Sequence, residues 1–179
     1  MGSLQGHFLL AHPAMADPNF AQTVVLIVQH GVDGAVGLVM NRPMEVTVAE
    51  AVGEAVAGGI DEPLFNGGPC QGEGQLMVVH GDASLGGVAV LDDVRFTTER
   101  VEIETVMMHP DVERRFFAGY AGWGPSQLED EIASGGWLTL PAARRDVFCP
   151  TDNWEQLKVR ATFGRFIDPD RIPDDPSLN

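Results

Sequence analysis

Runs of apolar residues predict a series of short strands, and the first two form a hairpin. Residues 23–29 are almost continuously apolar and β-branched, as in a strand that is buried on both faces. A turn cluster at residues 30–34 separates them from a second apolar run at residues 35–40. Gly37 interrupts this second run, which predicts a close backbone approach or a β-bulge at that point.

Four later segments share the strand pattern. They are residues 75–80, 88–91, 94–97 and 115–120. Asp92 and Asp93 separate the middle pair, which predicts a hairpin with a two-residue turn. We interpret residues 65–70 and 121–125 as loops, because glycine and proline are frequent in both.

Helical spacing is clearest at residues 47–57, where apolar residues recur at i, i+3, i+4 and i+7 from Val48 onward. The glycines at positions 58 and 59 end this predicted helix. Residues 98–108 alternate like a strand but also fit a helix capped by Thr98. We favour the helix.

Two more helices are predicted from their first turns. Ser126 and Glu129 have the spacing of a capping box, and Leu128 is on the apolar stripe of the helix that follows. Asp152 and Glu155 begin the last predicted helix in the same way.

The order of these elements predicts an α+β fold. Strands and short helices alternate irregularly, so a doubly wound parallel sheet is not favoured. Residues 1–163 are interpreted as a single domain. Residues 164–179 are rich in proline and aspartate, which is typical of an extended or disordered tail.

The negative net charge disfavours two classes of binding partner, nucleic acids and anionic membranes. The 179 residues include 11 Lys+Arg and 26 Asp+Glu, which gives −15. Such a chain is repelled by phosphate backbones and by anionic membrane surfaces, so direct binding of nucleic acid or membrane is disfavoured. Solubility is the simplest role of this acidity. The start of the chain has no basic segment of the kind that precedes a secretory signal, so we expect no such signal.

General motifs give little evidence of catalysis. The P-loop, zinc-protease and α/β-hydrolase signatures do not occur in the sequence. His80 ends a predicted strand two residues before Asp82, which makes it a candidate general base, although a polar residue at a strand end is the favoured interpretation. Cys70 and Cys149 are far apart and are expected to be reduced thiols. We expect no metal and no cofactor.

Three turns, at residues 41–43, 66–69 and 119–124, are the candidate binding site, because ligand-binding groups gather at strand ends and in loops. The residues that could supply polar handles, close backbone approach or stacking faces are Asn41, Arg42, Asn66, Gly67, Gly68, Tyr120, Trp123 and Gln127. The alternative is that the glycines only satisfy turn geometry, that Trp123 belongs to the core and that Arg42 is solvated.

The same turns carry a resemblance to the YqgE/AlgH family. The matching stretches include residues 6–15, 34–43, 67–69 and 119–132, and the similarity runs in order from Gly6 to about Ala161. The resemblance implies a cytoplasmic bacterial protein with an α+β fold built on a mixed, barrel-like sheet and short helices. Members of the family are often labelled transcriptional regulators, with no assigned molecular activity.

Two functional hypotheses follow, besides a weaker third one, direct regulation by DNA binding, which requires a basic face. The first is a binding or regulatory protein that acts through a protein or a small ligand rather than by contacting DNA. The alternative is an enzyme for a small phosphorylated or acyl substrate, in which Arg42 holds the anion, His80 is the base, and Gln127 or loop N–H groups stabilise charge. Both require the three turns to meet in the folded chain.

Overall fold

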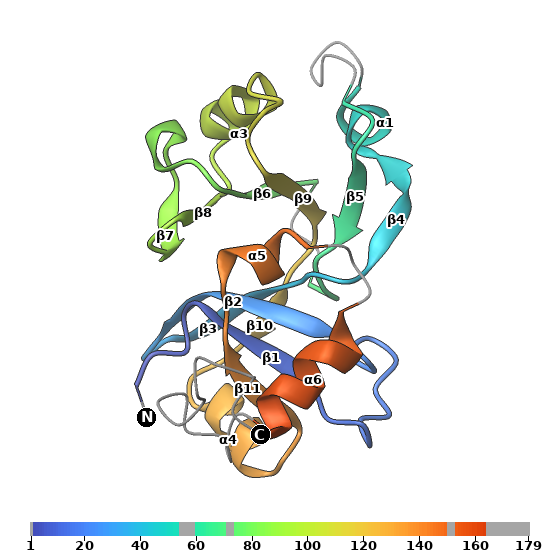
Figure 1. The fold of residues 1–179 in the computed structure, drawn as a ribbon, viewed down its shortest axis with the longest axis vertical. Coiled ribbons are helices and arrows are strands. Elements are labelled where there is room, and N and C mark those ends of the chain that lie inside the picture. The colour runs from blue at the N-terminus through green and yellow to red at the C-terminus, as the bar shows by residue number, and fades with distance from the viewer. Residues whose placement is uncertain (1, 54–59, 71–73, 150–152, 164–179) are drawn as a thin grey trace, which may run out of the picture.

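The structure is a computed structural model that describes residues 2–53, 60–70, 74–149 and 153–163. Its strands form two sheets, one above the other in Figure 1, with helices on their outer faces and at one side. The α+β class is therefore confirmed. The strands form two separate sheets rather than one closed barrel.

The first sheet is entirely antiparallel. Its strands, in spatial order, are β10 (Ala121–Trp123), β3 (Gly34–Val39), β2 (Val24–Gly31), β1 (His7–Ala11) and β11 (Trp137–Pro141). The predicted hairpin of residues 23–29 and 35–40 is β2 and β3. Of the two alternatives for Gly37, the bulge is found, because the β2–β3 register shifts between Ile27, its partner, and Gln29. A Cβ on Gly37 would meet side chains rather than backbone, the nearest being Val25 Cγ1 at 2.6 Å.

The second sheet is mixed, because β5 and β9 run parallel and its other pairs are antiparallel. Its strands, in spatial order, are β4 (Pro43–Thr47), β5 (Pro63–Asn66), β9 (Arg114–Ala118), β6 (Leu76–His80), β8 (Val94–Thr97) and β7 (Val88–Leu91). The predicted hairpin around Asp92 and Asp93 is β7 and β8.

Short helices cover the outer faces of the sheets and one side of the space between them (Figure 1). They are α1 (Val48–Val52), the 3-10 turn η1 (Ala83–Leu85), α3 (Arg100–Met107), α4 (Gln127–Ala133), α5 (Arg144–Val147) and α6 (Trp154–Phe163). Within the described ranges, no helix is both long and apolar enough to span a membrane.

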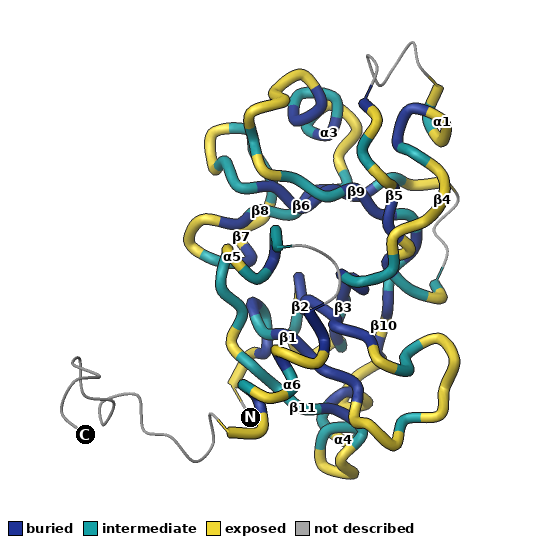
Figure 2. The backbone as a smooth tube through the Cα atoms, turned by 45° about the vertical axis from the view of Figure 1, so that its right-hand side comes forward, coloured by how far each residue is buried: buried dark blue, intermediate teal, exposed yellow. Residues whose placement is uncertain are grey.

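The core has three apolar layers, which follow from the alternation of side chains along each strand. Phe8 and Leu26 of the first sheet meet Phe117 of the second in the central layer, which α5 and α6 close at the side. The outer face of the first sheet packs against α4, and the outer face of the second packs against α1 and α3. Figure 2 shows the buried strands between more exposed helices and turns.

Several predicted boundaries are corrected. Residues 65–70 are not all loop, because β5 extends to Asn66, and residues 121–125 include β10. These short segments become strands through their partners, β9 and β3, which local sequence does not reveal. Strands β1, β4 and β11 were not predicted. Pro43 can begin β4 because this strand is at a sheet edge, where the missing N–H costs no ladder bond.

The helix caps also differ from the prediction. Ser126 has φ 62° and makes no capping hydrogen bond, and Gln127 Oε1 accepts from the Gly124 N–H instead. The capping box is at Thr47 and Glu50, at the start of α1. The helix over residues 98–108 is confirmed as α3, but Glu99 rather than Thr98 is its N-cap.

Helix α1 is shorter than predicted and ends at Val52, where Gly53 follows with φ 87°. The predicted glycine stop at positions 58 and 59, the cap at Asp152 and the tail at residues 164–179 lie outside the described residues.

Candidate functional site

The three predicted turns meet where the two sheets approach each other. A Cβ on Gly67 would lie 2.2 Å from the Gly119 carbonyl oxygen, and one on Gly68 would lie 2.3 Å from the Tyr120 carbonyl carbon. Only residues without a side chain permit this approach. Cys70 and Tyr120 exchange two backbone hydrogen bonds of 2.9 Å, which hold the two turns together.

The turn at Arg42 joins the same corner through backbone hydrogen bonds. The Asn66 N–H donates to the Arg42 carbonyl over 2.9 Å, and the Val39 N–H donates to the Gly67 carbonyl over 2.8 Å. Arg42, Asn66 and Gly68 also line one small cavity of about 70 Å³. The structure therefore brings Arg42, Asn66, Gly67 and Gly68 together.

Trp123 and Gln127 lie elsewhere. Trp123 is 7% exposed, packs edge-on against Trp137 with ring centres 6.1 Å apart, and donates its Nε1–H to Glu131 Oε2 over 2.9 Å. Gln127 donates to the other oxygen of Glu131 and caps Gly124. Trp123 therefore belongs to the packing between α4 and the first sheet, and Gln127 is an exposed residue at the start of α4.

Asn41 and Tyr120 mainly support the fold. Asn41 accepts from the Val24 N–H and donates to the Gln22 carbonyl, so its amide ties two loops together. Tyr120 is partly buried against the central core layer.

His80 is not part of this corner. It is fully buried, and its strand partners are Arg95 and Arg114. Leu76 pairs with Ala118 beside Asn66, and His80 is four residues further along β6, which corresponds to roughly 13 Å. This position does not supply the alternative enzyme hypothesis with a base near Arg42.

The environment of His80 is polar but desolvated. Burial lowers the pKa of His80, and the nearby charges of Asp82 and Glu102 oppose this effect only in part. Neither ring nitrogen has a hydrogen-bond partner among the described residues. Protonation of His80 would therefore place a cation in a dry site beside Arg95.

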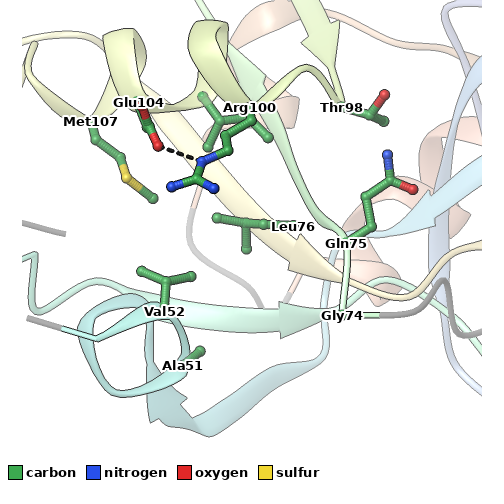
Figure 3. Close-up of a pocket in the computed structure, with 10 residues that line it drawn as sticks. Ala51, Val52, Gly74, Gln75, Leu76, Thr98, Arg100, Glu104 and Met107 are labelled. Carbon is green, nitrogen blue, oxygen red and sulfur yellow. Dashed lines mark hydrogen bonds and ion pairs between the residues drawn. The ribbon is translucent and has the colours of Figure 1, made fainter. Parts of the chain in front are cut away.

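A concave surface lies on the outer face of the second sheet, between α1 and α3. We call it the groove. Its main cavity has a volume of about 430 Å³. Figure 3 shows Leu76 at its centre, with Val52 and Ala51 of α1 on one side and residues of α3 on the other.

A second cavity of about 310 Å³ continues the groove toward the place where Gly67 and Gly68 contact Gly119 and Tyr120, which we call the glycine corner. Both cavities are lined by Ala51, Val52, Gly74, Gln75 and Leu76. The second also reaches Asn66, Gly68 and Gly119, so two of the predicted turns form its end.

The groove combines an apolar floor with a polar rim. Leu76 and Val52 are half-buried, and Ile103 and Met107 are buried beside them. On the rim, Arg100 Nε donates to Glu104 Oε1 over 2.7 Å, and this interaction raises the pKa of Arg100. Within the described ranges, no three potential metal ligands cluster in the protein.

The sequence did not identify the groove. Ala51 and Val52 are the i+3 and i+4 positions of the apolar spacing that begins at Val48, but Ala51 is exposed and Val52 is half-buried. Apolar spacing shows that a helix has a packed face. It does not show that two helices leave part of a sheet uncovered between them.

Comparison with known proteins identifies the family. The profile of the AlgH-like family matches residues 8–163. A UPF0301 protein of Streptomyces avermitilis is 37% identical and aligns over 100% of this chain and 97% of its own length. A UPF0301 protein of Chlorobium limicola is also 37% identical, over 97% and 95%.

Solved structures agree with this result. The AlgH protein of Pseudomonas aeruginosa has a TM-score of 0.71 and 33% identity, and the alignment covers 90% of this chain and 89% of that one. The protein DIP2367 of Corynebacterium diphtheriae has a TM-score of 0.75 and 27% identity, with coverage of 89% and 87%. The resemblance seen in the turns is thus confirmed, and the chain belongs to the AlgH-like family.

Proposed function

We propose that this protein is a cytoplasmic binding protein that holds a segment of a partner protein in the groove between α1 and α3. Any regulatory role would be exerted through that partner. The observation that carries the proposal is the continuous concave surface with an apolar floor formed by Leu76, Val52, Ile103 and Met107.

The shape of the groove favours a polypeptide segment over an enclosed small molecule. Ala51, Gln75 and Arg100 line it and are exposed, so it is open along the surface. Met44 and Val46 of the edge strand β4 are each 38% exposed, and Met44 lines the second cavity. Two flanking helices and an apolar floor suit the anchor side chains of an amphipathic segment.

Charge indicates which segment would bind. The charged residues that line the groove are Arg100 and Glu104, which pair with each other. The flanking helices add Glu50 and Glu102 outside the lining and no further base. The chain as a whole has a net charge of −15. A partner segment with apolar anchors and flanking Lys or Arg residues would be attracted, and an acidic one would be repelled.

The same charge supports an indirect form of regulation. A protein that contacts DNA directly needs basic side chains to neutralise phosphates. In the described structure, Arg100, Arg114 and Arg144 are each paired with a carboxylate. A regulatory effect mediated by a protein partner requires no such basic surface.

Site-specific photo-crosslinking tests the proposal. A benzophenone amino acid replaces Gln75 in the groove or, as a matched control, Val101, which is 76% exposed on α3 and does not line the groove. After irradiation in cells, mass spectrometry identifies the cross-linked peptides. We expect position 75 to capture segments with apolar anchors and basic flanks, and position 101 not to do so.

The captured segment is then made as a synthetic peptide and titrated with the purified protein. Leu76→Glu should weaken its binding at least tenfold, whereas Val101→Glu should leave it unchanged. The proposal fails if position 75 captures no more than position 101, if the captured segments are acidic, or if Leu76→Glu binds the peptide like the wild type.

A further inference from the structure

Arg42 differs from most arginines in the described structure because no carboxylate lies within ion-pair distance of it. The arginines that do have such a partner are Arg100, Arg114, Arg144, Arg145 and Arg160. A chain with 26 acidic residues could readily supply a partner for Arg42. Its guanidinium instead donates, through Nη2, to the carbonyls of Ala21 over 3.0 Å and Pro18 over 3.4 Å.

The position of Arg42 is fixed by its neighbours. The Asn66 N–H bonds to its carbonyl, and the amide of Asn41 ties the adjacent loops together. Gln22, next to the acceptor Ala21, has φ 57°, a left-handed conformation that is costly for a residue with a Cβ. The guanidinium group of Arg42 is therefore held in place before any ligand binds.

The cavity beside Arg42 contains donors and no acidic lining residue in the described structure. Besides Arg42, its polar lining comes from Asn19, Asn66 and Gly68. Asn66 Oδ1 accepts from the Gly68 N–H over 3.1 Å, which leaves the Nδ2 group of Asn66 as a donor. At about 70 Å³ the cavity is sized for one small anionic group rather than a whole nucleotide.

A larger cavity on another side of Arg42 is less suited to an anion. It has a volume of about 310 Å³ and includes Gln22, Trp154 and Glu155. The Glu155 carboxylate pairs with Lys158 Nζ over 2.7 Å, so its charge is only partly offset. An anion is therefore expected on the Asn66 side of Arg42.

We propose that this corner is a binding site for an oxyanion, the phosphate or carboxylate group of a small ligand. The planar guanidinium of arginine can donate two parallel hydrogen bonds to two oxygens of a phosphate or a carboxylate, and it supplies the positive charge. The amide of Asn66, at the end of β5, supplies a second donor. The two proposed sites are neighbours, because Asn66 and Gly68 also line the second cavity of the groove. Arg42 does not line the groove, so loss of anion binding in Arg42→Ala would leave the proposal for a protein segment standing.

Titration of the isotope-labelled protein with inorganic phosphate tests the site. Sodium chloride keeps the ionic strength constant, and the readout is the amide NMR signals of Asn66, Gly67 and Gly68. We expect saturable shifts that are confined to these residues and to the Arg42 turn. A parallel titration with acetate identifies the source, because tighter phosphate binding indicates a phosphorylated ligand and tighter acetate binding a carboxylate ligand.

Two variants and two controls make the result decisive. Arg42→Ala should weaken binding at least tenfold. Asn66→Asp should abolish it, because it keeps the acceptor for Gly68 at an exposed position but adds a negative charge. Arg145→Ala removes an equal charge at an exposed position outside both proposed sites, and Val32→Asp adds one at a turn residue that is 90% exposed, so neither should change binding.

The Asn66→Asp variant keeps the test valid if Arg42→Ala does not fold. Non-saturable shifts, shifts spread over the whole surface, or equal affinities in wild type and Asn66→Asp would show an adventitious ion only and overturn the proposal.

Discussion

Replacing Gly67 with alanine tests whether the glycine corner depends on close backbone contact. The new Cβ would lie 2.2 Å from the Gly119 carbonyl oxygen, and 3.2 Å from both the Gly119 carbonyl carbon and Leu38 Cδ2. The first contact is with backbone, which cannot rotate away as a side chain can. Gly67 or Gly119 must therefore move by about 1 Å, and ordinary packing tolerates no such overlap.

The expected cost comes from overpacking and from weakened hydrogen bonds. Overpacking a buried site costs about 1–3 kcal/mol. A shift of Gly67 also strains its N–H bond to the Ala118 carbonyl and its carbonyl bond from the Val39 N–H, each worth about 1 kcal/mol. We expect Gly67→Ala to lower the free energy of unfolding by about 3–5 kcal/mol, which corresponds to a fall in Tm of roughly 10 °C for a chain of this size.

Urea unfolding followed by circular dichroism measures this change, and Gly31→Ala is the matched control. Gly31 is exposed in β2, its φ is not in the left-handed region, and a Cβ there meets nothing within 4 Å. Gly31→Ala should leave stability unchanged or raise it by about 0.4–1 kcal/mol through the unfolded state. If Gly67→Ala unfolds within about 1 kcal/mol of the wild type, the close contact at the corner is refuted.

Two further predictions concern buried polar groups. Because burial lowers the pKa of His80 in the folded state, the unfolded chain takes up a proton first as the pH falls. The free energy of unfolding should therefore be constant above about pH 6.5 and decline below it. Urea titrations across pH 5–8 should show a smaller decline for His80→Gln than for the wild type. Glu131→Ala removes the carboxylate that accepts from the Nε1–H groups of Trp123 and Trp137, at 2.9 and 2.8 Å. This change should lower the free energy of unfolding by about 2–4 kcal/mol and alter the tryptophan fluorescence emission. An unaltered emission spectrum and an unaltered stability would contradict this role of Glu131.

The parts of the fold that sequence predicts are those in which a segment's own pattern decides its structure. The apolar run of β2 is buried along most of its length, and its hairpin with β3 follows from the turn between them. Strand β10 has only three residues, Ala121–Trp123, and two of them do not favour strands. It forms because β3 offers it a partner, which is information that local sequence does not contain.

Helix N-caps also depend on structure that the local residue spacing does not contain. Ser126 and Glu129 match the capping-box pattern, but Ser126 is drawn into a left-handed conformation after the Gly124–Pro125 turn. In that conformation its hydroxyl does not cap the helix, and Gln127 bonds to Gly124 instead. Thr47 and Glu50 have the same spacing with extended backbone at Thr47, so their box forms. Spacing predicts a possible cap, and the preceding turn decides whether it is used.

The three glycine-rich turns illustrate how one segment can serve both fold and site. Gly67 and Gly68 permit a close approach that joins the turns, which is the structural explanation for those glycines. Trp123 belongs to the core, as the alternative interpretation of the sequence held. Arg42 and Asn66 are different, because the interlocked backbone leaves their side chains lining a cavity. A substitution that opens the glycine contact would therefore damage both the fold and the cavity, whereas one that changes only the Asn66 side chain would separate the two roles.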